Sequence, residues 1–191
     1  SFIGFGIAPR INAAGRISDA AIAVRALLAD EHEAPSLAEE LCEINRQRQV
    51  EENRIAEEAY EMIRDLADLD ENPVIVLDSN EWQQGIIGIV ASKITEKYGL
   101  PSILVSFDYT RHPAPFDEGR GSGRSIKGLN LVEALNYCED LLIKHGGHEL
   151  AAGLTIKRSA LDDFRDRINE YAREHLTEDA FKITMDADCE L

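Results

Sequence analysis

Two adjoining glycines followed by a histidine are the part of this sequence with the clearest chemical potential. Gly146, Gly147 and His148 lie in the stretch KHGGHELAAG, residues 144–153. Glycine has no Cβ, so the backbone can turn sharply and approach a ligand closely, and the two amides can converge as an anion-binding nest. The neighbouring imidazole can donate a hydrogen bond or a proton. The pattern is typical of a phosphate grip, although a helix stop followed by a structural histidine fits it equally well.

A second glycine-rich segment, GRGSGRSIKG at residues 119–128, carries donors that suit phosphate oxygens. Ser122, Gly123 and Arg124 stand at its centre, and both a hydroxyl and a guanidinium fork can bind phosphate. The spacing differs from a Walker loop, because no Gly-Lys-Ser/Thr opens a helix here. The alternative is a glycine-rich hairpin or bulged strand with a solvated basic face.

A third segment, APRINAAGR at residues 8–16, sets polar side chains among small residues. We expect it to be extended, so that Arg10 and Asn12 share one side, with Arg16 further along. Considered alone, it is best interpreted as a loop that ties down the end of the chain.

Together with two further stretches, these segments resemble the catalytic core of the RecJ exonucleases, a family of the DHH phosphoesterase superfamily. The matching stretches run in the family's order and are PRINAAGR (9–16), NRQRQVEEN (45–53), WQQGIIGIVASKI (82–94), GSGRSIKG (121–128) and KHGGHELAAGLTI (144–156). The GGHxxAAG pattern marks only the wider superfamily's DHH-associated domain, whereas the first two stretches point to RecJ. One position departs from the family, since Gln83 stands where a histidine often follows the tryptophan.

The resemblance implies an enzyme that hydrolyses single-stranded DNA from its 5′ end, in DNA repair and recombination. His148 would be the catalytic contact to the substrate phosphate, donating a hydrogen bond to developing negative charge. The implied substrate-binding positions are Arg10, Asn12, Arg16, Ser122, Gly123, Arg124, Gly146 and Gly147.

The sequence lacks the residues that would hold the family's metal ions. It has no DHH triplet, and its aspartates do not form the family's metal-binding motifs. Two-metal hydrolysis needs carboxylates that hold both ions. We therefore expect no metal site in this chain. We expect manganese or magnesium to be bound by an N-terminal lobe of a larger enzyme, and this part to bind substrate without cleaving it.

The net charge of −16 argues against a general nucleic-acid-binding surface. The charge is unevenly distributed, however. Residues 36–71 hold 12 acidic and 4 basic side chains, a net of −8, whereas residues 111–128 hold 4 basic and 2 acidic ones, a net of +2. Screening over about 8 Å at physiological salt lets the two regions act separately. The single-stranded DNA that the resemblance implies as partner would therefore bind at the locally basic segment.

Hydropathy and cysteine content indicate where the chain would reside. No apolar run reaches the roughly 18 residues of a membrane span, so no membrane partner is expected. Cys42, Cys138 and Cys189 are far apart, with no Cys-x-x-Cys pair. Widely spaced cysteines predict reduced thiols and a cytoplasmic location.

The resemblance implies a DHH-associated domain in this chain. The pattern of elements itself predicts an α/β fold with a mixed, partly parallel sheet flanked by helices, preceded by a long interdomain connecting helix. That helix, from about 36 to 69, has apolar ends and a polar middle, which suits a strut whose middle faces water or a cleft. The first two strands flank a helix and should pair in parallel. The expected strands are 74–77, 103–107, 119–125, 153–156 and 181–191, and the other helices are 17–30 (with Ser18 as N-cap), 85–98, 131–143 and 159–175. Residues 1–9 are expected to be a severed strand or core segment.

These elements suggest four consecutive parts. The expected parts are the remnant of a DHH catalytic lobe (1–35), the connecting helix (36–71), the DHH-associated substrate-binding domain (72–178) and the start of a following domain (179–191), for which an OB-fold is one candidate.

Three other interpretations stay open at this point. A small-nucleotide phosphodiesterase or nanoRNase shares the GGH grip, but the long helix and PRINAAGR disfavour it. A non-catalytic RNA-binding lobe, like that of alanyl-tRNA synthetases, carries a related motif. A metal site at Cys138, His145 and His148 is least favoured, because structural zinc needs four ligands. For Trp82, packing is favoured over stacking with a base.

Overall fold

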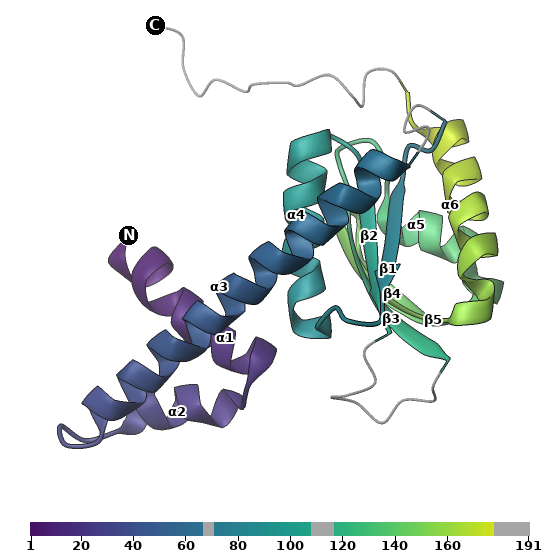
Figure 1. Cartoon of the computed structure of the whole chain (residues 1–191). Coiled ribbons are helices and arrows are strands. Elements are labelled where there is room, and N and C mark those ends of the chain that lie inside the picture. Colours follow the sequence, from purple (N-terminus) through teal and green to yellow (C-terminus); the bar gives the residue numbers. More distant parts are fainter. Residues whose placement is uncertain (67–70, 108–116, 178–191) are drawn as a thin grey trace, which may run out of the picture.

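The computed structural model describes residues 1–66, 71–107 and 117–177 (Figure 1). A small helical part and an α/β part are joined by one long helix. In chain order the elements are a π-helical turn (Ile3–Ile7), α1 (Ala8–Ile17), α2 (Ala20–Leu28), α3 (Ala34–Asp65), β1 (Ile75–Ser79), α4 (Gln84–Tyr98), β2 (Ser102–Ser106), β3 (Glu118–Arg124), α5 (Leu131–Tyr137), a 3-10 turn (Glu139–Leu141), β4 (Leu142–His148), β5 (Ala151–Lys157), a 3-10 turn (Arg158–Ala160) and α6 (Leu161–His175).

The five strands form one mixed sheet in the order β1-β2-β3-β5-β4. The pair β1 and β2, on either side of α4, is parallel, and the other neighbours are antiparallel. The predicted mixed α/β fold, its parallel pair and its long helix are therefore confirmed.

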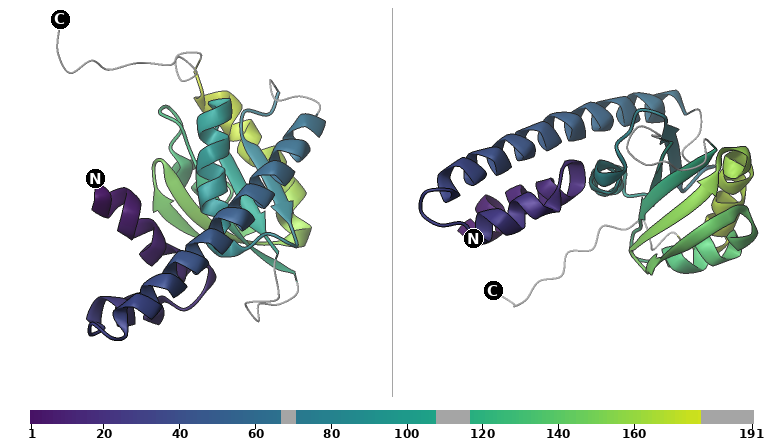
Figure 2. Two further views of the ribbon diagram at one scale, coloured as in Figure 1. Left: turned by 60° about the vertical axis from the view of Figure 1, so that its left-hand side comes forward. Right: turned by 90° about the horizontal axis from the view of Figure 1, so that it is seen from below.

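Helices cover the two faces of the sheet unequally. α5 and α6 pack on one face, and α4 lies on the other face over β2 and β3 (Figures 1 and 2). Between the sheet and α6, the side chains that helical spacing predicts to point inward are all buried; they are Leu161, Phe164, Ile168 and Tyr171. This leaves β5 and β4 as the strands that extend beyond α4.

The long helix α3 packs at its two ends on different cores. Leu41 joins a small cluster with α1 and α2, whereas Ile55, Ala59 and Ile63 join the core formed with α4 and the sheet. Its 32 residues span about 48 Å. Two separate apolar ends confirm the predicted strut.

The prediction that the middle of α3 faces water or a cleft is wrong in part. Asn45 and Glu52 are buried there, and the Arg48 side chain donates to Asn45 and pairs with Glu52. The Nζ of Lys93 on α4 lies 2.5 Å from the Glu52 carboxylate. The polar middle is therefore packed against α4, because ion pairs satisfy its charges.

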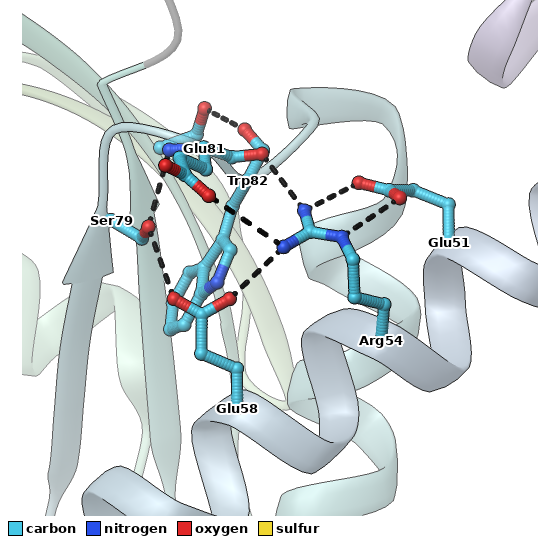
Figure 3. Close-up of polar contacts among 7 residues, drawn as sticks. Glu51, Arg54, Glu58, Ser79, Glu81 and Trp82 are labelled. Atoms are coloured by element: carbon cyan, nitrogen blue, oxygen red, sulfur yellow. Dashed lines mark hydrogen bonds and ion pairs between the residues drawn. The ribbon is translucent and has the colours of Figure 1, made fainter.

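Arg54 fastens α3 to the loop between β1 and α4 (Figure 3). Its guanidinium donates to Glu51 at 2.6 and 3.0 Å and to Glu58 at 3.2 Å. It also donates to the carbonyl of Glu81 at 3.1 Å. The hydrogen bond to Glu51, foremost among its partners, raises the pKa of Arg54. Trp82 follows in the same loop and is fully buried, so the predicted packing role is confirmed.

The start of the chain differs from its prediction. Residues 8–16, expected to be extended, lie in α1, where a proline in the first turn is compatible with a helix. Ser18 ends α1 rather than capping the next helix. That cap is Asp19, whose carboxylate accepts from the backbone N–H of Ala21 at 2.8 Å. Residues 1–7 are not a core segment either, since Phe2 and Phe5 are exposed.

Two further expectations concern the C-terminal half. The helix expected over 131–143 ends at Tyr137, and a strand that the sequence analysis missed begins at Leu142. The expected strand at 181–191 lies outside the described residues, as does most of the loop that precedes β3. None of the helices in the described ranges is long and apolar enough to cross a bilayer.

Candidate functional site

A β-bulge at the start of β4 sets the direction of every side chain that follows it. Leu142 pairs with Ile156, and Lys144 pairs with Thr155, so β4 advances two residues where β5 advances one. A regular strand would keep residues 142 and 144 on one face. The extra residue, Ile143, instead turns Lys144, and with it Gly146 and His148, away from the core.

The face of the sheet opposite α5 and α6, which we call the open face, carries nine residues of β3, β5 and β4 in register. They form three cross-strand rows: the cation row (Arg120, Thr155, Lys144), the glycine row (Ser122, Gly153, Gly146) and the imidazole row (Arg124, Ala151, His148). Adjacent rows are two residues apart, or about 6.6 Å along a strand. The sheet thus brings the two glycine-rich segments of the sequence side by side.

A hollow of about 500 Å³ lies over this face. Its lining comprises Gln84, Arg120, Gly121, Lys144, His145, Gly146, Gly153, Leu154 and Thr155. Gln84 comes from the first turn of α4, so that helix forms one wall of the hollow. Its volume falls within the roughly 300–1,000 Å³ typical of small-molecule sites.

Arg124 is held in place by polar groups of β3 and α4. Its Nε donates to Ser92 Oγ at 3.1 Å, and its Nη1 donates to Ser122 Oγ at 3.2 Å. The carbonyl of Gly123 accepts from the same Nη1 at 2.7 Å. A Cβ at Gly88 would lie 2.8 Å from Ser122 Oγ and 3.1 Å from the Arg124 side chain. Glycine at position 88 therefore makes room for both donors beneath α4.

Arg16 reaches the same place from the end of α1. Its Nη1 donates to the carbonyl of Gly85 at 3.0 Å, and a Cβ on Gly85 would lie 2.1 Å from the Arg16 carbonyl oxygen. Glycine at position 85 therefore permits the close approach of α1 and α4.

Two guanidinium groups therefore lie near one another beside the first turns of α4, at the edge of the open face. Burial, and secondarily the charge of Arg16, lower the pKa of Arg124. Within residues 1–66, 71–107 and 117–177, no carboxylate forms an ion pair with either group. Adjacent cations without a counter-charge attract an anion, and guanidinium geometry suits phosphate oxygens.

The Gly-Gly-His segment is the end of β4 rather than a sharp turn. The turn comes next, at residues 149–150, and its carbonyls accept hydrogen bonds from Ser125 and Leu131. Strand amides alternate in direction, so the predicted nest of converging amides is not formed. His148 is exposed on the open face.

The two adjoining glycines differ in their surroundings. Gly147 has a φ of +155°, and a Cβ there would lie 2.4 Å from the carbonyl oxygen of Ala151. A Cβ on Gly146 would meet nothing within 4 Å. The backbone therefore requires glycine at 147, whereas at 146 glycine leaves space above the sheet.

Three predicted positions do not present side chains to the open face. Residues two apart on a helix are about 200° apart around its axis, so Arg10 and Asn12 do not share a side as expected. The Arg10 guanidinium is turned toward Cys42 Sγ, at 3.2 Å, and the Gly6 carbonyl. Asn12 is exposed on α1. Gly123 points to the core, where a Cβ would lie 2.8 Å from Leu131.

Several residues of the open face were missed in the sequence. They are Gln84, Ser92, Arg120, Lys144, Gly153 and Thr155. For Arg120 the strict alternation with Ser122 and Arg124 was the available signal. For Lys144 no local signal exists, because its direction depends on the bulge.

Metal-ligating side chains do not converge in the described ranges, where no group of three or more His, Cys, Asp or Glu residues could hold an ion. His145 and His148 point to opposite faces of β4, and His145 Nε2 lies 2.8 Å from Asn136 Oδ1. Burial raises the pKa of the Cys138 thiol to about 11. These three residues therefore do not form the site considered above.

Residues 71–174 match the DHHA1 domain family. This stretch is 104 of the 191 residues and contains the whole sheet with α4 and α5. The chain belongs to the DHHA1 domain family. The open face described above therefore lies entirely within the DHHA1 domain, apart from the contribution of Arg16.

The similarity to known proteins extends beyond the DHHA1 domain. The chain is 40% identical over 187 residues to the single-stranded-DNA-specific exonuclease RecJ of Bacillus subtilis, covering 97% of this chain and 23% of that protein. Crystal structures of RecJ from Thermus thermophilus with Mg²⁺ and with Mn²⁺ match with TM-scores of 0.79 and 0.78. Both are 36% identical and cover 92% of this chain, but 26% and 25% of the solved chains. The predicted resemblance is confirmed, and the chain spans about a quarter of these relatives' length.

Proposed function

We propose that this chain is the substrate-binding part of a RecJ-like exonuclease that hydrolyses single-stranded DNA from the 5′ end, in DNA repair and recombination. The observation that carries the proposal is the pair Arg16 and Arg124, two guanidinium groups that lie near one another, of which Arg124 is bonded to Ser122, with no carboxylate ion-pair partner among the described residues. The similarity to RecJ proteins over nearly the whole chain supports the same substrate class.

In this proposal the open face grips the DNA backbone. Arg124 and Ser122 hold a phosphate, with Arg16 adding charge from α1. His148 donates a hydrogen bond to the scissile or adjacent phosphate as negative charge develops there. Gly146 leaves the strand free to approach the sheet, and Gly147 holds the backbone in place beside it. Arg10 and Asn12 of α1 would line the hinge side of the active site in the complete enzyme.

The metal ions are not assigned to this chain, because its described residues offer no suitable ligand set. We propose that Mg²⁺ or Mn²⁺, present in the related structures, is held by another lobe of the complete enzyme. Residues 1–35, which include α1 and α2, would be the C-terminal remnant of that lobe. Their exposed apolar side chains support this arrangement, since large apolar patches mark interaction surfaces. They include Phe2, Phe5, Leu27 and Leu28.

The proposal also covers the division of the chain into parts and its location in the cell. α3 is the connecting helix, residues 72–178 are the DNA-gripping domain, and residues 179–191 begin a further domain. A cytoplasmic location fits the free thiols of Cys42 and Cys138.

Arg124→Ala tests the phosphate grip directly. Binding of 3′-fluorescein oligothymidylate with a 5′-phosphate would be followed by fluorescence anisotropy at several salt concentrations. The variant should bind about tenfold more weakly, and its salt slope should fall by about 0.7–1, the contribution of one phosphate contact. The matched control is Arg64→Ala, which removes an exposed arginine at the C-terminal end of α3. This variant should leave the affinity and the salt slope unchanged. An unchanged slope for Arg124→Ala would contradict a phosphate contact.

A further inference from the structure

The cation row is the feature of the open face that the proposed function leaves unused. Arg120 of β3 and Lys144 of β4 both pair with Thr155 of β5, so they flank its hydroxyl on one face. Both cations are exposed. Neither forms an ion pair with a carboxylate of the described ranges. Two cations about 9–10 Å apart at the backbone can converge on one oxyanion, and the hydroxyl supplies a third donor.

The hollow of the open face extends over the whole of this row. Its lining includes all three members of the cation row and both glycines of the glycine row. The imidazole row does not contribute to that lining. The hollow is therefore a separate part of the open face from the place where Arg16 and Arg124 lie near one another.

The glycines beneath the hollow are not needed by the packing of the protein. A Cβ on Gly146 would meet nothing within 4 Å, and one on Gly153 would meet only the Gly121 carbonyl oxygen at 3.7 Å. Neither has a positive φ. Glycine weakens a strand interior and often marks a place where a ligand approaches closely. These two positions therefore keep the floor of the hollow clear.

The row spacing relates the hollow to the first phosphate site. The cation row lies four residues from the imidazole row along β3, or about 13 Å. Both rows open to the same side of the sheet, so one extended strand can cross them in succession. One row further on, Glu118 pairs with Lys157, and there a carboxylate interrupts the run of cations.

We propose that Arg120, Lys144 and Thr155 form a second phosphate subsite, which binds a backbone phosphate further along the same DNA strand. The glycine row lies under the stretch of DNA strand between the two sites. This inference rests on the proposed function, because it assumes that a nucleic-acid strand crosses the open face at the imidazole row.

A scan with neutral linkages tests the second subsite. In a short 5′-phosphorylated oligothymidylate, one methylphosphonate replaces each phosphodiester in turn, and anisotropy measures binding to the purified 191-residue chain. With the native sequence, neutral linkages at two separated positions should each weaken binding about tenfold. In the double variant Arg120→Ala/Lys144→Ala, the loss at one position should disappear while the other remains, and the salt slope should fall by about 0.7.

Two further variants separate the subsite from general effects. Arg167→Ala/Arg173→Ala removes the same charge from α6. This helix lies on the covered side of the sheet, the face on which α5 and α6 pack, so the variant should still lose affinity at both linkage positions. Gly153→Val places a side chain on the floor of the hollow and should weaken binding without lowering the midpoint of thermal unfolding.

The possible outcomes distinguish this inference from the proposed function. A linkage profile in Arg120→Ala/Lys144→Ala identical to the native one overturns the second subsite and leaves the Arg124 site standing. An equal loss of affinity in the α6 control also overturns it, because net charge then explains the effect. If no linkage matters in the native chain, the proposed function itself fails.

Discussion

The two sides of the sheet use glycine for opposite reasons. On the covered side, a Cβ on Gly119, Gly121 or Gly123 would lie 2.6–2.8 Å from a core side chain, so the packing excludes any larger residue. On the open face, a Cβ on Gly146 would meet nothing within 4 Å, and one on Gly153 only a carbonyl oxygen at 3.7 Å. One set is therefore required by the core, and the other leaves a surface clear.

This difference shows where a glycine-rich motif carries functional information. The glycines of GRGSGR let Leu154, Leu131 and Phe107 pack tightly against β3, and so they belong to the core. The chemistry of that segment lies on the residues between them, which face the other way. At Gly146 of β4 and Gly153 of β5 the order is reversed, since these two glycines themselves lie on the open face.

The largest expected effect comes from filling a glycine of the covered side. In Gly121→Val the new Cβ would begin 2.7 Å from the Leu154 side chain, and the added methyl groups would crowd the same core. Overpacking of this kind costs about 1–3 kcal/mol, and we expect the upper end of that range. Urea-induced unfolding, monitored by circular dichroism, gives the change. Gly153→Val, on the neighbouring strand, should leave the free energy of unfolding unchanged or higher, and equal losses in the two variants would remove the distinction.

The fold could be predicted where local periodicity decides it. The inward side chains of α6 recur at helical spacing, and β1 and β2 are short apolar runs on either side of one helix. The buried position of Trp82 follows from the same logic. For each of these elements, the pattern of a few consecutive residues is enough to predict the structure.

The site could be predicted only in part, because its geometry depends on pairing between distant residues. The direction of Lys144 depends on the bulge at Ile143, which exists only relative to β5. The polar residues of 8–16 predicted an extended segment, yet packing of α1 on α3 holds them in a helix. Arg54 gives no local sign of its role either, since the Glu81 carbonyl that it binds lies 27 residues away.

The dependence of stability on pH above 8 tests how well the covered side of the sheet excludes water from the Cys138 thiol. Cys138 is fully buried there, and burial raises its pKa to about 11. The folded protein therefore keeps the thiol proton over a pH range in which the unfolded chain, with a thiol pKa of about 8.5, has lost it. The resulting stability is present below that lower value and is lost as the pH rises toward 11.

The expected size of this loss is about 2 kcal/mol between pH 8 and pH 10. Urea unfolding of the native chain and of Cys138→Ala at both values isolates it, because other titrating groups are common to the two proteins. The gap between the two stabilities should narrow at pH 10. Val132→Ala, a nearby truncation without a titrating group, should show a constant gap. The same narrowing in Val132→Ala would assign the effect to general loosening of the core.

The smallest expected change in stability, and the most direct comparison, involves the two adjoining glycines of β4. Gly146→Ala should raise the free energy of unfolding by about 0.5–1 kcal/mol, since alanine restricts the unfolded chain and its Cβ would meet nothing within 4 Å. Gly147→Ala should lower it, because φ is +155° and the Cβ would lie 2.4 Å from the Ala151 carbonyl oxygen. Single-stranded DNA binding, measured by anisotropy on both variants, separates the two roles. Gly146→Ala should bind more weakly although it is more stable, because its methyl group stands in the hollow. A Gly146→Ala protein that is destabilised as much as Gly147→Ala would show that both glycines serve the backbone alone.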